Sequence, residues 1–83
     1  MNNNGIKVRV FDMEEGLAEY ENIKSIRITS KNYNLLVMKD YMPMIGEIVG
    51  TVDIIGDNTN LSFKQIKAFY MNANNVFNLM IEE

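Results

Sequence analysis

Acidic side chains are the first residues in this sequence that could do chemistry, because paired carboxylates can serve as general acid and base. Adjacent pairs occur at Glu14 and Glu15 and at Glu82 and Glu83. A general acid needs its pKa raised by an enclosed pocket, whereas neighbouring acids in a turn or at a chain end are ordinarily hydrated. We therefore interpret these carboxylates as solvated surface groups.

Metal ligands and nucleophiles give equally little support for catalysis. The oxygen-rich run Asp-Asn-Thr-Asn at 57–60 lacks the D-x-D-x-D-G spacing and the closing Glu of calcium loops. The sequence has no His and no Cys, so it offers no imidazole or thiolate ligand and no histidine to activate a serine such as Ser25 or Ser62. The sequence predicts no metal, no cofactor and no enzymatic activity.

The charge balance excludes another class of function. Eight basic and 11 acidic residues give a net charge of −3, which repels a phosphate backbone. Nucleic acid is therefore not an expected partner. No apolar run approaches the ~18 residues of a membrane span, and the N-terminal residues do not have the pattern of a secretory signal. We expect no membrane insertion and a cytoplasmic location.

The elements that must position any site are strands. Apolar and polar residues alternate in several short runs separated by turn-forming residues, which is typical of β-structure. Residues 1–5 are polar and are expected to be a disordered N-terminus, and residues 6–83 are expected to form one domain. The predicted strands cover 6–11, 17–20, 23–30, 35–38, 47–55, 61–71 and 76–81. Their number and spacing predict an all-β fold, a small β-sandwich of short antiparallel strands or a small barrel.

Three details of these elements are open to test. The apolar run 35–38 is predicted to be buried on both faces, and residues 39–46 around Pro43 are predicted to be an irregular connection. Gly50 falls on the inward face of its strand, which suggests a bulge or a close crossing of another backbone. Residues 63–70 also fit a helical period in part, so a helix is the alternative to a strand there.

The segment around Pro43 has an unusual composition. Met38, Met42 and Met44 lie within seven positions of one another, together with Tyr41. Flexible thioethers suit surfaces that adapt to a partner, but they also fill gaps in a thin core. Both interpretations, core packing and partner contact, stay open at this point.

The order of these segments resembles a known family, the N-terminal β-sandwich domain of the epsilon subunit of F-type ATP synthases, called delta in mitochondria. The resemblance extends over residues 7–82. It is carried by V-R-V at 8–10, I-K-S-I-R-I-T at 23–29, L-L-V-M-K-D-Y-M-P-M at 35–44, G-T-V-D-I at 50–54 and Y-M-N-A-N-N-V at 70–76. The sequence departs from the family at Asn32 to Asn34, in place of a tip glycine, at Tyr41, in place of histidine, and at Met42, in place of alanine. The family's C-terminal helical hairpin has no counterpart in these residues.

The resemblance implies a function in protein contacts. In that family the sandwich performs no chemistry; it packs on the gamma subunit and rests on the polar loops of the membrane c-ring. The residues that correspond by position to the partner-contacting loops, with two neighbouring methionines, are Lys31, Asn32, Tyr33, Asn34, Tyr41, Met42 and Met44. The leading hypothesis is therefore a non-catalytic protein-interaction domain, peripheral to a membrane through its complex.

Two other interpretations are kept. The chain could be a stand-alone regulatory or assembly module that has the same fold and no role in an ATP synthase. Exposed sheet edges in so small a domain also make self-association plausible.

Overall fold

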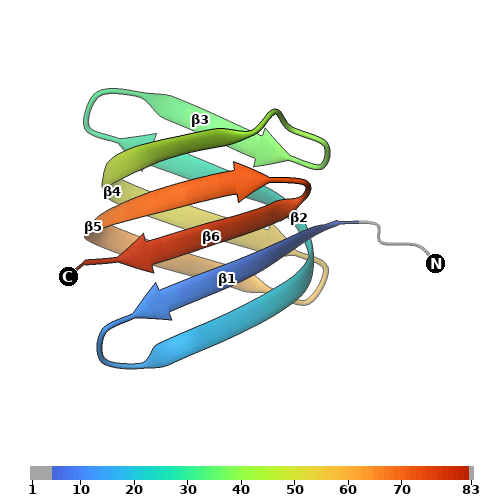
Figure 1. Cartoon of the computed structure of the whole chain (residues 1–83), viewed down its shortest axis with the longest axis horizontal. Coiled ribbons are helices and arrows are strands. Elements are labelled where there is room, and N and C mark those ends of the chain that lie inside the picture. Colours follow the sequence, from blue (N-terminus) through green and yellow to red (C-terminus); the bar gives the residue numbers. More distant parts are fainter. Residues whose placement is uncertain (1–4, 83) are drawn as a thin grey trace.

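The structure, a computed structural model, describes residues 5–82 and is all-β, with no helix in that part of the chain (Figure 1). This confirms the predicted fold class. Residues 1–4 and 83 lie outside the described residues, so the expected disorder at the N-terminus is not tested. The strands are β1 (Ile6–Asp12), β2 (Gly16–Ser30), β3 (Asn34–Met38), β4 (Met44–Gly56), β5 (Asn60–Ala73) and β6 (Val76–Ile81). Residues 63–70 lie within β5, so the strand is confirmed there and the helix is wrong.

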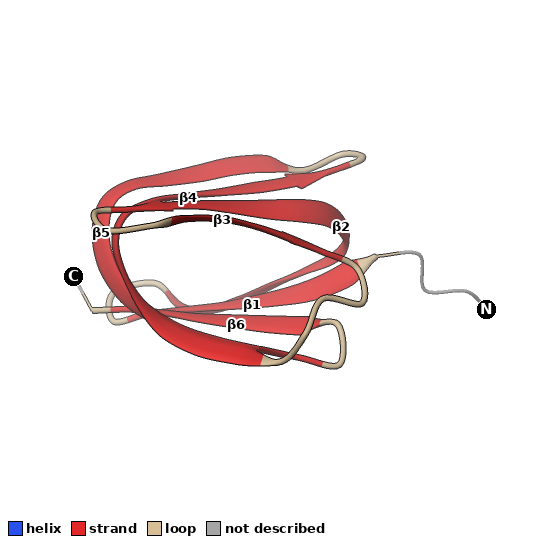
Figure 2. Ribbon diagram, turned by 90° about the horizontal axis from the view of Figure 1, so that it is seen from above, coloured by secondary structure: helices blue, strands red, loops and turns tan. Residues whose placement is uncertain are grey.

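The strands form one sheet that closes on itself. Their order is β1-β6-β5-β4-β2-β3, and β1 also pairs with β2, which closes the barrel. Figure 2 shows that this barrel is flattened into two layers, so it resembles a sandwich whose strands cross from one layer to the other. The prediction of antiparallel pairing alone is wrong in one place, because β1 and β6 run parallel. These two strands lie at opposite ends of the chain, so no hairpin constrains their direction.

Three long strands supply both layers. Layer 1 contains β1, β6, the first part of β2, the first part of β4 and the second part of β5. Layer 2 contains β3, the second part of β2, the second part of β4 and the first part of β5. The sequence predicted two strands at 17–20 and 23–30, but β2 runs continuously from Gly16 to Ser30. The core therefore lies between the two layers, which share the bent strands β2, β4 and β5.

The bends coincide with irregularities in the pairing. β2 carries a register shift around Asn22, whose φ is 58°, where it leaves β1 and joins β4. β5 carries another around Gln65, with φ 56°, opposite the register shift between Gly50 and Val52. An extra residue in one strand increases local twist and bends it. These bulges are what let a 14-residue strand serve two layers.

Gly50 confirms the predicted close crossing. A Cβ atom at this position would collide with the carbonyl oxygen of Thr29 and lie 3.1 Å from the Cα of Ser30. β4 therefore passes so close to β2 that only a glycine fits. The absence of a side chain at the inward position thus has a steric cause.

The core is aliphatic. Alternate residues of every strand point inward, and those buried most completely are Val8, Ile23, Ile26, Ile28, Val37, Ile48, Val52, Ile54, Ala68, Phe77 and Leu79. Each large side chain contributes about 1.5–3 kcal/mol when fully buried. Tyr70 stacks on Phe77 with ring centroids 5.5 Å apart, which extends this core toward β4.

Two sequence predictions around Pro43 are wrong. In β3 only Val37 is fully buried, while Leu36 and Met38 are exposed, because layer 2 has a core on one face only. The irregular connection is also shorter than predicted, since β4 begins at Met44 and pairs with β5 from there.

Candidate protein-binding surface

The residues predicted to contact a partner fall at two ends of the molecule. Lys31 and Asn32 form the turn between β2 and β3, and Tyr41 and Met42 lie in the connection between β3 and β4. β3 runs the length of layer 2 between these two segments, so they lie at opposite ends of it (Figure 1). The structure therefore separates the two loops, but it brings the side chains of Tyr33 and Tyr41 near Tyr70 of β5.

The β2–β3 turn is held against layer 1 by Tyr33. Its hydroxyl donates a hydrogen bond of 2.6 Å to the carbonyl oxygen of Glu47 in β4. The backbone amide of Lys31 also donates to the carbonyl oxygen of Val49, at 2.8 Å. Tyr33 therefore has a structural role, whereas Lys31, Asn32 and Asn34 are exposed at this end.

The β3–β4 connection is fastened to the turn between β5 and β6. The amide of Asp40 donates to Oδ1 of Asn75 at 2.6 Å, and Nδ2 of Asn75 donates to the Asp40 carboxylate at 3.0 Å. Asn72, which is buried, donates from Nδ2 to the carbonyl oxygen of Met42 at 3.2 Å. These bonds fix the path of the connection.

The side chains of this connection divide between the two interpretations of the methionine-rich segment. Tyr41 and Met44 pack against the hydrophobic core. Met42 is 64% exposed, and Met38 is exposed as well. Core packing therefore describes one part of the segment, and the other part is available at the surface.

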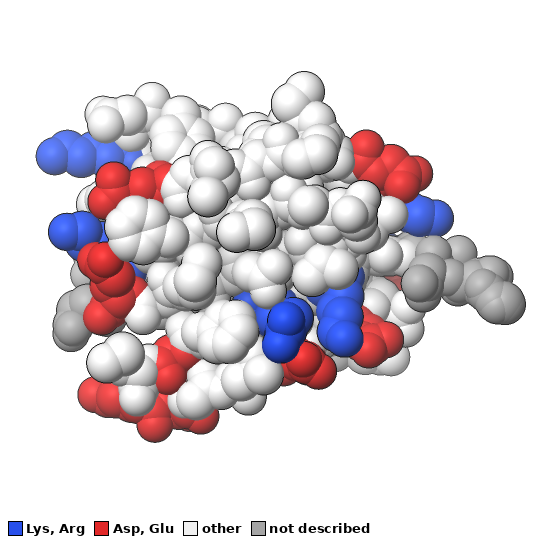
Figure 3. Space-filling view, viewed as in Figure 1, with Lys and Arg blue, Asp and Glu red and all other residues white. Residues whose placement is uncertain are grey.

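A larger apolar surface lies on the outside of layer 1, and the sequence analysis missed it. Phe69 of β5 lies opposite Met80 of β6, Met80 lies opposite Phe11 of β1, and Phe11 lies opposite Leu17 of β2. Ile45 and Met71, paired in β4 and β5, add to this row. We call these six residues the apolar face. Figure 3 shows this side of the molecule, where the central and upper area is uncharged, basic and acidic side chains interrupt the lower middle, and the other charged side chains lie toward the margins.

The apolar face is large for a small domain. Its six side chains are 37 to 74% exposed. Together they form one contiguous exposed patch, and the largest apolar patch on a monomer, roughly 300–600 Å², is often functional. Ion pairs flank it on both sides, Arg9 with Glu19 at 3.1 Å and Lys67 with Glu82 at 3.9 Å. An apolar centre with a charged rim is the usual anatomy of a protein-binding surface.

The outside of layer 2 gives the contrast. Arg27 and Asp53 lie opposite each other in β2 and β4, and Ser62 donates a 2.6 Å hydrogen bond to the Asp53 carboxylate. The outward positions of this layer are mainly polar, with three exposed apolar residues, Leu36, Met38 and Ile55, that are 39, 51 and 39% accessible. The outer face of layer 1 is therefore largely apolar, and the outer face of layer 2 is mainly polar.

A signal for the apolar face was present in the sequence. Within 61–71 the outward positions Phe69 and Met71 are as apolar as the inward positions Ala68 and Tyr70. A strand that covers a core on one face should be polar on the other. The departure from alternation marks the exposed face.

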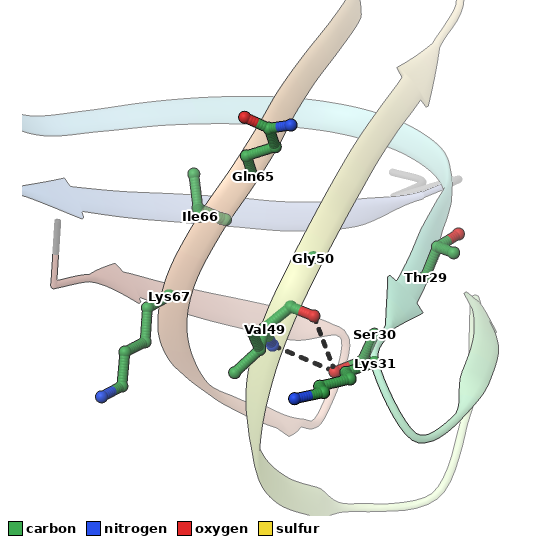
Figure 4. Close-up of a pocket in the computed structure, with 8 residues that line it drawn as sticks. All are labelled: Thr29, Ser30, Lys31, Val49, Gly50, Gln65, Ile66 and Lys67. Carbon is green, nitrogen blue, oxygen red and sulfur yellow. Dashed lines mark hydrogen bonds between the residues drawn. The ribbon is translucent and has the colours of Figure 1, made fainter.

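A hollow lies at the end where β4 and β5 bend (Figure 4). It has a volume of about 580 Å³ and is lined by Thr29, Ser30, Lys31, Val49, Gly50, Gln65, Ile66 and Lys67. The Ser30 hydroxyl is engaged there, accepting from the Val49 amide at 3.0 Å. In the close-up both lysine side chains extend toward the left from separate strands, with their nitrogens apart, so they do not converge on a common ligand position.

Within residues 5–82, the structure also shows how the turn at 57–60 and the acidic side chains are arranged. The turn at 57–60 is closed by a 2.7 Å bond from the Gly56 amide to the Thr59 carbonyl, and Asp57 pairs with Lys24 at 2.9 Å. No three His, Cys, Asp or Glu side chains in this range gather as a metal site would require. The same residues contain no helix long and apolar enough to cross a membrane.

Comparison with known proteins identifies the fold. No protein-family model matches this chain, and no curated protein sequence does. Among solved structures, a chain of the cryo-EM structure of the Tetrahymena thermophila mitochondrial ATP synthase central stalk and c-ring superposes with a TM-score of 0.72. The two are 10% identical, and the match covers 99% of this chain and 65% of that chain. At that identity the match shows that the chain shares the fold of a component of that assembly.

Proposed function

We propose that this chain is a non-catalytic docking domain of a rotary ATPase central stalk, and that it binds a protein partner through the apolar face. The observation that carries the proposal is the difference between the outer faces of the two layers. A polar outer face is stable in water by itself, whereas a contiguous apolar face of this size marks a surface that a partner covers. The fold shared with a chain of the Tetrahymena assembly supports the choice of complex.

The proposal assigns separate roles to the two ends of the molecule. The apolar face is the main contact, for which the resemblance of the sequence suggests a gamma subunit. Lys31, Asn32 and Asn34 at one end, and Met42 at the other, are secondary contacts, with the polar loops of a c-ring as the suggested partner. In this arrangement the domain stays outside the bilayer, on the cytoplasmic side, and is attached to the membrane through its complex.

Capture from native membranes tests which complex is involved. The tagged protein is incubated with detergent-solubilised membranes of its own organism, and the retained proteins are identified by mass spectrometry. We expect gamma, beta and c subunits. Retention of proteins unrelated to an ATPase, repeated at several salt concentrations, would contradict the stalk assignment and favour a stand-alone module with the same fold.

The secondary contacts are tested by Lys31→Glu. Lys31 is exposed and its side chain makes no ion pair among the described residues, so reversal of its charge leaves the fold intact. We expect weaker recovery of c subunits with unchanged recovery of gamma. Tyr33→Ala is unsuitable for this purpose, because it also removes the hydrogen bond to Glu47.

A further inference from the structure

Strand β3 forms an unpaired edge of layer 2. Among residues 5–82 it pairs with β2 alone. The amide of Ser30 donates to the carbonyl oxygen of Tyr33 at 2.8 Å, which sets the phase of the ladder between the two strands. Hydrogen-bonded pairs alternate in an antiparallel ladder, so the backbone groups of Leu35 and Val37 face β2. Those of Asn34, Leu36 and Met38 face outward.

The other open edges in this part of the chain are protected in the ways that natural sheets use against pairing. The first part of β2 carries the charges of Glu19 and Glu21. The first part of β5 carries Lys64 and the bulge at Gln65.

The first part of β4 is protected as well. It carries Glu47, whose carbonyl oxygen already accepts the Tyr33 hydroxyl. β3, by contrast, reads Asn-Leu-Leu-Val-Met and has no charge, proline or bulge. β3 is short, and its Met38 carbonyl oxygen accepts the Tyr41 amide at 3.2 Å, but the amide and carbonyl of Leu36 at its centre have none of these protections.

We propose that β3 pairs antiparallel with β3 of a second copy of this chain, about a twofold axis at Leu36. This pairing places Leu36 opposite its own copy and Asn34 opposite Met38. The amide and carbonyl of each Leu36 then meet those of its copy, and the Met38 amide meets the Asn34 carbonyl, while the Met38 carbonyl keeps its bond from the Tyr41 amide. The two copies of layer 2 then form one continuous sheet. The inference goes beyond the proposed function and does not use the apolar face, so edge pairing and docking through that face can each hold without the other. The pairing does take up Asn34 and the turn at Lys31 and Asn32, so it competes with the secondary contacts proposed above.

The side chains of the edge suit this pairing. Leu36 and Met38 are 39% and 51% exposed, and the twofold axis brings both copies of each into one apolar cluster. Beyond the paired residues, the β2–β3 turn of one copy comes near the β3–β4 connection of the other, so that Lys31 approaches Asp40, whose carboxylate also accepts from Asn75 of its own chain. Lys39 then lies opposite Tyr33 rather than opposite a second cation. No like charges face each other across the pairing.

The extent of the contact sets its strength. β3 has five residues, so the paired surface is smaller than the ~800 Å² per partner of a standard stable interface. We therefore expect a reversible dimer that dissociates on dilution. The unoccupied apolar face is large enough to add non-specific association, which the experiment has to separate from edge pairing.

Sedimentation velocity on the purified full chain, over a wide range of concentration, measures the equilibrium. We expect the wild type to pass from monomer to dimer, and Leu36→Lys to stay monomeric at the highest concentration. Ile55→Lys is the matched control, because Ile55 is 39% exposed like Leu36 but lies on the central strand β4. It should dimerise like the wild type. A monomeric wild type, or equal loss of dimer in both variants, would overturn the proposal.

Single cysteines give a second readout that does not depend on tolerance of a buried charge. The chain has no cysteine, so each variant carries one thiol. Two Cα atoms of a hydrogen-bonded antiparallel pair lie about 5.5 Å apart, within disulfide range. Under mild oxidation Leu36→Cys should form a disulfide-linked dimer far faster than Ile55→Cys. Equal rates, or no cross-link at position 36, would show that the edges do not meet.

Discussion

At the scale of single residues, Tyr70 is the titratable group that the fold perturbs most. Its side chain is 4% exposed and points inward from β5, with the Gly46 backbone against its ring. Burial, followed by a hydrogen bond with Tyr33, raises the pKa of Tyr70 to about 12. The neutral phenol is therefore part of the packing between layer 1 and the β2–β3 turn.

This shift predicts that stability falls at high pH. Above pH 10.0 the unfolded chain loses the Tyr70 proton, while the folded chain keeps it to about pH 12. Stability is therefore lost as pH rises across this window, by up to about 2.7 kcal/mol for a shift of this size. Urea unfolding at a series of pH values measures the slope of the free energy of unfolding against pH. Tyr70→Phe should flatten it, and an unchanged slope in that variant would contradict the assignment.

Gly50 is the residue whose replacement should cost most stability. A methyl group there meets the Thr29 carbonyl, and backbone cannot move aside as a flexible side chain can. Gly50→Ala should lower the free energy of unfolding by about 3 kcal/mol or more, as severe steric conflicts do. Thr51→Ala, at the next position, is the control and should cost under about 1 kcal/mol. Equal losses in chemical denaturation would show that the crossing is not tight.

At the scale of elements, the β5–β6 turn both closes a hairpin and holds the β3–β4 connection. Asn74 and Asn75 have φ values of 51° and 63°, as a two-residue type I′ turn requires. Glycine satisfies that backbone at either position. Asn75, in addition, exchanges two hydrogen bonds with Asp40, and Asn74 does not.

The two asparagines therefore form a matched pair for mutation. Asn75→Gly should cost about 1–2 kcal/mol and accelerate hydrogen exchange at the Asp40 amide, because that amide loses its acceptor. Asn74→Gly should leave both quantities close to wild type. Similar exchange rates at the Asp40 amide in the two variants would show that the hydrogen bonds between Asn75 and Asp40 do not protect this amide.

The strands could be predicted from the sequence where alternation and turn residues agree, as in β1, β6 and the second part of β2. The parallel pairing of β1 with β6 could not, because it joins segments about 70 residues apart and leaves no local pattern. The merging of 17–20 with 23–30 was not predicted, because the inward alternation changes phase between Tyr20 and Ile23; the positive φ of Asn22 makes this change a bulge within one strand. The loop residues proposed as a site came from a resemblance, and tertiary contacts later separated Tyr33 from its neighbours.

At the scale of the whole molecule, the two layers present opposite outer surfaces. Layer 1 exposes Phe69, Met80, Phe11 and Leu17 in one row, and layer 2 exposes mainly polar groups. The proposed function has a partner cover the layer 1 side. The edge of β3, on the polar layer, is a separate place of contact and stays open when the apolar face is occupied.

The most direct test of this account is a binding titration of the partner recovered by capture. Phe69→Lys and Ile55→Lys are compared with the wild type by calorimetry, since the two side chains are 41% and 39% exposed on opposite layers. Folding of each variant is checked by circular dichroism. The account predicts at least a tenfold loss of affinity for Phe69→Lys, about 1.4 kcal/mol, and wild-type affinity for Ile55→Lys. Equal affinities for the two variants, or a loss confined to Ile55→Lys, would contradict it.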